Sequence, residues 1–262
     1  RDEWVYDHSI NSLKEKIQYF IDRYNDDMEK SKDKIDESNI NTLLKSDIKY
    51  TRDLKRSLLK ANKLSIKNDE FRKCLYRVFV LQDLYFANEL NEMRYQTPSI
   101  FPKSSAENVL LAINQGNKPF NLLASKYLVD LHFNGDSQCF PLYRFNENGD
   151  RIDNITDWGL EQFRTHYKDK KITKEDIFHY VYAVLHNPAY RKKYELNLKR
   201  EFPRIPFYAN FKQWAKWGKK LMELHIGYET VKPYPLKVNE FKTKAEAKKQ
   251  VKELKEVKEP VE

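Results

Sequence analysis

Hydrophobic periodicity changes twice along this chain, and this limits the folds it can adopt. From Ser9 onward, apolar residues recur every three or four positions, the period of one helix face. The members of this face are Leu13, Ile17, Phe20, Ile21, Tyr24 and Met28. Ser9 is placed as their N-cap, and a second helix is predicted from Thr51 to Ala61. The N-terminal part is therefore predicted to be helical.

Strand-forming runs rich in β-branched and aromatic residues follow between residues 74 and 155. They cover residues 78–81, 84–86, 108–113 and 127–133, and a β-hairpin is predicted from residues 142–145 and 151–155. Helical signals return over 156–227, with caps predicted at Thr156, Thr173 and Asn187. The pattern predicts an α+β fold, with N-terminal helices, a central mixed or antiparallel sheet with a hairpin, and a C-terminal helical part.

Glycine spacing excludes several classes of enzyme. The glycines are Gly116, Gly135, Gly149, Gly159, Gly218 and Gly227, and no two are close enough for a dinucleotide fingerprint or a P-loop. Such loops need glycine because their backbone approaches the phosphate closely. We therefore expect the chain to bind neither nucleotide triphosphate nor S-adenosylmethionine through a known loop.

The net charge of the chain indicates what it could bind, and its two cysteines indicate the compartment in which it works. The net charge is +9, from 48 basic and 39 acidic residues, which suits a polyanion such as nucleic acid, although a basic protein without such a partner is an alternative. Cys74 and Cys139 lie far apart among apolar neighbours, as in a reducing compartment. With no signal peptide or membrane-length apolar run, we predict a cytoplasmic protein. Its start at Arg1 suggests a fragment of a longer chain.

No catalytic or metal-ligating residue is predicted. His179 and His186 share a helix face, and His132 lies near Cys139, but packing or surface roles fit both pairs better than metal binding. The segment Asn187-Pro188-Ala189-Tyr190 resembles the Asn-Pro-Pro-Tyr loop of adenine-N6 methyltransferases. A helix cap followed by a first turn explains it better, because helical patterns flank it.

Three groups of residues are candidates for contact with DNA. Arg52, Arg56, Lys60 and Lys63 are predicted to form a stripe on one helix face, which suits a phosphate backbone but also an ordinary solvated face. A second basic cluster contains Arg191, Lys192 and Lys199, and could face phosphate or a neighbouring domain. A loop carries Arg94, Gln96 and Lys103 as candidates for reading bases, with plain surface as the alternative.

Several blocks in order resemble the C-terminal specificity region of type ISP restriction-modification enzymes. The blocks lie at residues 1–6, 74–79 with 84–86, 137–143, 172–207 and 224–229, and include Ser137-Gln138-Cys139-Phe140-Pro141-Leu142-Tyr143 and Lys199-Arg200-Glu201-Phe202-Pro203-Arg204-Ile205-Pro206. The chain departs from the family at Val78, where proline is usual. It also ends in a Lys/Glu-rich tail in place of a further folded segment, so we expect it to be incomplete.

The resemblance implies a division of labour within a longer polypeptide. Similar enzymes carry an Mrr-like nuclease, a RecA-like translocase, a coupler and an adenine-N6 methyltransferase, so S-adenosylmethionine, ATP and Mg would belong to those parts and no cofactor to this one. This region would grip double-stranded DNA opposite the methyltransferase and read an asymmetric site. The expected segments are 1–68, linking to an upstream methyltransferase domain; 69–236, the target-recognition domain; and 237–262, a charged tail.

Two other functions compete with target recognition. The runner-up is an interdomain coupler that touches DNA only nonspecifically, since a basic, aromatic surface would look the same. The other is that the chain is itself a methyltransferase or nuclease. The missing glycine loop argues against a methyltransferase. For a nuclease, no Asp…Glu-x-Lys set of residues can be placed after a predicted strand.

Overall fold

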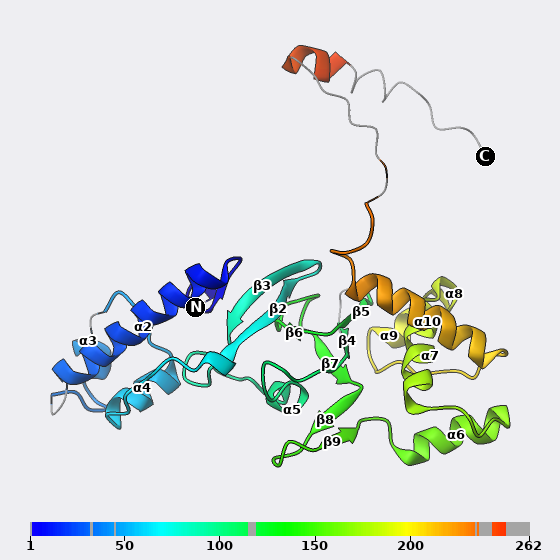
Figure 1. Cartoon of the computed structure of the whole chain (residues 1–262), viewed down its shortest axis with the longest axis horizontal. Helices are drawn as coiled ribbons and strands as arrows, with labels where there is room; N and C mark the ends of the chain where they lie inside the picture. The colour runs from blue at the N-terminus through cyan, green and yellow to red at the C-terminus, as the bar shows by residue number, and fades with distance from the viewer. Residues whose placement is uncertain are drawn as a thin grey trace. The chain divides into compact units, whose positions relative to one another are not determined.

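The computed structural model of the chain describes residues 2–31, 34–44, 46–114, 119–233, 235 and 243–249. Two compact units are present, Arg1–Tyr228 and Glu229–Glu262. Helices dominate both ends of the first unit and strands dominate its middle (Figure 1). The predicted α+β class is therefore confirmed.

The N-terminal helices pack on a four-stranded sheet. The helices are α1 (Asp2–Val5), α2 (Ile10–Ser31), α3 (Ile40–Leu43) and α4 (Arg52–Leu59). The sheet has the order β1-β3-β2-β6, from β1 (Tyr6–Asp7), β2 (Phe71–Arg77), β3 (Val80–Tyr85) and β6 (Leu128–Val129). A 3₁₀ turn, η1 (Asn68–Glu70), leads into β2. Five of the six predicted core positions of α2 are buried, and Met28 is half-buried. A first core forms between the helices and this sheet.

A second, three-stranded sheet separates two hydrophobic cores. Its order is β5-β4-β7, from β4 (Leu110–Ile113), β5 (Leu122–Ser125) and β7 (Gln138–Pro141). Leu110 and Ala112 of β4 belong to the first core, whereas Leu111 and Ile113 belong to the second. Successive side chains of a strand point to opposite faces, so a continuous apolar run covers both faces of this sheet.

The C-terminal helices build the second core. They are α6 (Asp157–Tyr167), α7 (Lys174–His186), α8 (Pro188–Lys193), α9 (Glu195–Leu198) and α10 (Phe211–Ile226). Helices α7 and α10 pack so closely that a Cβ atom on Gly218 would lie 1.8 Å from the His179 carbonyl oxygen. Tyr180 is fully buried between them and stacks on Phe211, with ring centroids 5.1 Å apart. Glycine at position 218 is therefore required by the close approach of two helices.

Local signals in the sequence were accurate here. The hairpin of β8 (Tyr143–Phe145) and β9 (Arg151–Asp153) forms as predicted, with Tyr143 opposite Asp153. Thr173 and Asp176 form a reciprocal capping box at the start of α7. Asn187 caps α8 by accepting a hydrogen bond from the Ala189 amide, so the helix-cap interpretation of this segment is confirmed.

The prediction of a single central sheet over 74–155 was wrong in two respects. The strands form three sheets, and β1 joins the first one from far outside the predicted range by pairing Tyr6 with Leu84. Val78 and Phe79 form the turn between β2 and β3 instead of a strand, and Phe79 adopts a φ of 57°. The apolar side chain of Val78 packs against the first core from this turn, whereas Phe79 is 48% exposed, so a run of apolar residues does not mark a strand here.

The second unit contributes one helical stretch, residues 244–249, within the charged tail. The rest of the predicted helix around Val251, Leu254 and Val257 lies outside the described residues. The predicted segment boundaries at 68 and 236 stay predictions, and the first core includes residues on both sides of position 68. Among the described residues, no helix is both long and apolar enough to cross a membrane.

Candidate nucleic-acid interface

Helix α4 presents two arginines to solvent. Thr51 caps it by accepting a hydrogen bond from the Leu54 amide at 3.1 Å, and Leu54 and Leu58 bury its inner face. On the outer face, the side chains of Arg52 and Arg56 are 59% and 64% exposed. Asp53 lies within ion-pair distance of both arginines, at 3.7 and 3.2 Å, so the helix keeps a net positive outer face.

The basic stripe is shorter than the sequence predicted. Helix α4 ends at Leu59, Lys60 is its C-cap, and Ala61 turns the chain with a φ of 51°. Lys60 and Lys63 are both exposed, but Lys63 follows the turn and is not on the helix. The assumption that helical spacing continues to position 63 was therefore wrong. Arg52 and Arg56 remain as the pair one turn apart on a regular helix.

A loop between β3 and α5 (Thr97–Ile100) is anchored against the start of α4. Leu90 is buried in the first core, and the Asn91 side-chain amide donates to the carbonyl oxygens of Tyr85 and Ala87. The Arg52 amide donates to the Glu92 carboxylate at 2.6 Å, which places that carboxylate at the helix N-terminus. The structure thus brings together two candidate groups that lie about forty residues apart in the sequence.

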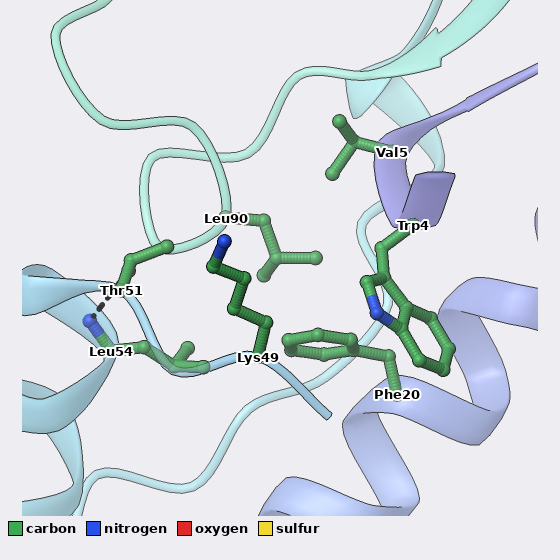
Figure 2. Close-up of a pocket in the computed structure, with 7 residues that line it drawn as sticks. All are labelled: Trp4, Val5, Phe20, Lys49, Thr51, Leu54 and Leu90. Atoms are coloured by element: carbon green, nitrogen blue, oxygen red, sulfur yellow. Dashed lines mark hydrogen bonds between the residues drawn. The ribbon is translucent and has the colours of Figure 1, made fainter. Parts of the chain in front are cut away.

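A small hollow lies beneath this junction. Figure 2 shows its wall, including Trp4, Phe20 and Leu90, with the Lys49 side chain crossing it and the Thr51–Leu54 capping bond at one side. Trp4 and Phe20 meet edge to face at 5.3 Å. The cavity volume is only about 10 Å³, enough for one water molecule. We read the hollow as core packing that supports α4 and the loop, too small for a ligand.

The three base-reading candidates lie in different environments. The Arg94 guanidinium donates to the Phe86 carbonyl at 3.0 Å and to Asn88 Oδ1 at 3.2 Å, and it lies over the Phe86 ring. Its Nε atom is buried without an acceptor among the described residues. Gln96 and Lys103 are exposed. Arg94 is therefore engaged within its own loop, whereas Gln96 and Lys103 face solvent.

The second basic cluster belongs to the other core. The helical segment that begins after the Asn187 cap is broken at Tyr194 into α8 and α9, which carry the buried residues Tyr190 and Leu198 of the second core. Arg191 caps the end of α7 through a 2.6 Å bond from Nε to the Leu185 carbonyl, and burial lowers its pKa. Lys192 is exposed, and Lys199 pairs with Glu195 at 3.0 Å.

Two half-buried histidines form a network with the buried Tyr182 on the second core. Tyr182 accepts a hydrogen bond from the Ala124 amide, and its own hydroxyl group meets Nδ1 of His225 at 2.6 Å. The Nδ1 atom of His186 donates to the Tyr182 carbonyl, and burial lowers the pKa of His186 to about 4. The described residues contain no group of three or more His, Cys, Asp or Glu side chains suited to a metal ion.

The exposure and backbone conformation of two residues in the candidate loop could not be read from the sequence. Met93 and Tyr95 flank Arg94 in the anchored loop, with 63% and 70% of their surfaces exposed. Both adopt positive φ, 58° and 48°. Apolar residues in a loop look like ordinary packing in sequence, and no local signal marks a left-handed backbone at residues other than glycine, asparagine or aspartate.

Comparisons with known proteins identify the family. A family model for the type ISP C-terminal specificity domain matches residues 1–260, and the chain belongs to this family. No curated protein matches the chain. Most of the matched range falls within the Arg1–Tyr228 unit, which therefore has the fold of a type ISP specificity domain.

Solved structures of large DNA complexes are similar to this chain. A cryo-EM structure of a DrdV–DNA complex is 48% identical with a TM-score of 0.84, and the match covers 90% of this chain and 23% of that chain. A nuclease-deletion mutant of the type ISP restriction-modification enzyme LlaGI in complex with a DNA substrate mimic is 29% identical (TM-score 0.76), covering 90% and 18%. The ATP-dependent type ISP enzyme LlaBIII bound to DNA is 26% identical (TM-score 0.75), covering 89% and 15%. This chain spans less than a quarter of each of those chains.

Proposed function

We propose that this chain recognises a double-stranded DNA target for a type ISP restriction-modification enzyme, and that α4 with its anchored loop is part of the contact surface. The observation that carries this proposal is the pair Arg52 and Arg56, exposed on a regular helix beside a fixed loop. Cations one turn apart can follow a phosphate backbone and set the register of the protein on DNA.

The division of labour follows from the family. We propose that an upstream methyltransferase domain of the same polypeptide carries the chemistry and acts on an adenine in an asymmetric site, while this chain is not an enzyme by itself. S-adenosylmethionine, ATP and Mg²⁺ would bind outside this chain. Its glycine spacing supports this, since no nucleotide-binding glycine loop can be placed. The cytoplasmic location stays a prediction from the sequence.

The test is the salt dependence of duplex binding. The dissociation constant of a labelled duplex is measured at several salt concentrations for the wild-type chain and for the double variant Arg52→Ala/Arg56→Ala. Each phosphate contact contributes about 0.9 to the slope of log K against log salt, so the double variant should lose about 1.8. The matched control, Lys216→Ala/Lys220→Ala, removes two exposed charges at the same spacing on α10 and should keep the slope.

Equal slopes for all three proteins would remove α4 from the interface. Absence of any duplex binding by the wild-type chain would contradict the proposal itself. Binding without preference among sequences would favour the alternative function, an interdomain coupler with only nonspecific DNA contacts.

A further inference from the structure

The loop between β3 and α5 holds an exposed apolar pair in an unfavourable backbone conformation. Met93 and Tyr95 both lie in the left-handed region, which side chains other than glycine, asparagine and aspartate rarely occupy. Both are mostly exposed, and the Tyr95 hydroxyl donates to the Met93 sulfur at 3.4 Å. Neither burial nor local backbone preference therefore explains the conformation.

The residues between and around the pair hold it in place. Arg94 turns inward, where Phe86 and Asn88 accept its hydrogen bonds and the Phe86 ring lies 5.1 Å from its guanidinium. Asn91 ties the start of the loop to β3, and the Thr97 amide donates to the Arg94 carbonyl at its end. Backbone strain that the surrounding structure enforces is concentrated at functional sites.

Charges of both signs lie near the pair. The Arg72 guanidinium lies 5.9 Å from the centroid of the Phe86 ring, which Arg94 also contacts. The Arg72 side chain is buried and pairs with Glu70 at 3.4 Å, so it supports the loop from inside the protein. Arg52 begins the helix whose N-terminus contacts the loop at Glu92. An exposed apolar tip beside the exposed arginines of α4 suits a ligand that is apolar at its centre and anionic at its edge, which describes the stacked bases and phosphates of DNA.

We propose that Met93 and Tyr95 form a wedge that stacks on or between bases of the bound DNA, with Arg94 as the positioning residue that aims it. This inference rests on the proposed function. Methionine and other apolar side chains inserted at base steps unstack and bend the duplex, and an aromatic ring stacks on any base. The wedge therefore adds affinity and DNA deformation without adding an ionic contact.

The test uses duplex DNA that the wild-type chain retains from a randomised pool. Loss of one base–aromatic stack should weaken binding roughly fivefold to hundredfold in Tyr95→Ala, with an unchanged salt slope because no phosphate contact is lost. Tyr95→Phe keeps the ring and should bind within about twofold of the wild type. Trp158→Ala is the matched control, since Trp158 is a 74% exposed aromatic residue on α6, and it should bind normally.

A glycine variant separates binding from folding. Glycine adopts positive φ without strain, so Tyr95→Gly should keep or raise the melting temperature while it loses affinity to the same extent as Tyr95→Ala. Arg94→Ala should also lose affinity, because the loop loses its inner anchor. A fall in melting temperature that accounts for the lost affinity of Tyr95→Gly would overturn the wedge and leave a structural role.

The two proposals fail in different ways. If the wild-type chain binds the duplex and Tyr95→Ala binds equally well, the wedge is overturned while DNA recognition stands. If the wild-type chain binds no duplex, DNA recognition by this chain is overturned and the wedge with it. A duplex with 2-aminopurine in place of adenine gives the direct readout, because wild-type binding should change its fluorescence and Tyr95→Ala should not.

Discussion

The chain carries two groups of cations that look equivalent in sequence and differ in the folded protein. Arg52 and Arg56 extend from α4 into solvent. Arg191 is turned inward, where it closes the end of α7 and lies 5.4 Å from the Phe120 ring. The first group is available to a polyanion, whereas Arg191 of the second group stabilises the fold. The comparison teaches that burial and hydrogen bonding decide which cations can bind DNA.

The same contrast separates the two cores. The first core supports α4 and the anchored loop, whereas the second core packs α7 and α10 against β4 and β5. We therefore expect substitutions on the second core to change stability, and substitutions on the α4–loop surface to change DNA binding. Four predictions test this separation, beginning with the largest effect.

Gly218→Ala should be the most damaging substitution on the second core. Its Cβ would lie 1.8 Å from the His179 carbonyl oxygen, so α7 and α10 would have to separate. The expected loss is on the order of 3 kcal/mol or more, measured by urea unfolding. Gly159→Ala is the control, because its Cβ would meet the Thr156 hydroxyl oxygen at an ordinary 3.4 Å and should change stability little. Equal stability of both variants would contradict the close helix packing.

Acid should destabilise the second core through His186. Burial lowers its folded pKa from 6.5 to about 4. The unfolded state therefore binds the proton first, and stability is lost as pH falls from about 6.5 towards 4, by roughly 3 kcal/mol at most. Urea unfolding across this range should show the loss in the wild type and a reduced loss in His186→Gln. His132→Gln, at an exposed site, should keep the wild-type profile.

Arg191→Ala should change the stability of the protein, whereas Arg52→Ala should change the salt dependence of DNA binding. Loss of Arg191 leaves the Leu185 carbonyl without this donor and should cost about 2 kcal/mol of stability with no change in the salt slope of DNA binding. Loss of Arg52 should change stability by less than about 0.5 kcal/mol and reduce the slope by about 0.9. Thermal unfolding and duplex titration on the same samples measure both. A reduced slope in Arg191→Ala would place the second cluster at the DNA.

Within the anchored loop, Gln96 should affect the sequence preference of DNA binding, and Arg94 should affect its overall strength. Gln96→Ala should relax preference at one base pair, by about 1 kcal/mol, if its exposed amide reads a base edge. Arg94→Gln should weaken binding to all sequences, because its guanidinium holds the loop. Selection from a randomised library by each variant compares the two. A changed preference in Arg94→Gln alone would identify Arg94 as the reader instead.

Sequence reasoning succeeded where the determinants are local. The buried face of α2, the β8–β9 hairpin and the Thr173 capping box depend on residues only a few positions apart. It failed where distant segments meet. The pairing of Tyr6 with Leu84 and the three-way division of the sheets depend on long-range packing that periodicity does not encode.

The candidate site shows the same limit. Charge spacing located Arg52 and Arg56, and residue type marked the loop around Arg94, but the contact of Arg52 with Glu92 joins them across the fold. The left-handed backbone of Met93 and Tyr95 gave no signal in the sequence because neighbouring residues impose it. The inward turn of Arg94 and Arg191 was equally hidden, since composition does not reveal which guanidinium finds carbonyl partners.

The central claim is that this chain reads DNA sequence, and selection from a randomised duplex library tests it most directly. The wild-type chain is incubated with the library at moderate salt, and the retained DNA is sequenced. The account predicts enrichment of one asymmetric site several base pairs long, and weaker retention by Arg52→Ala/Arg56→Ala. Retention of DNA with no enriched site, from this chain and from a version joined to the proposed methyltransferase domain, would contradict it.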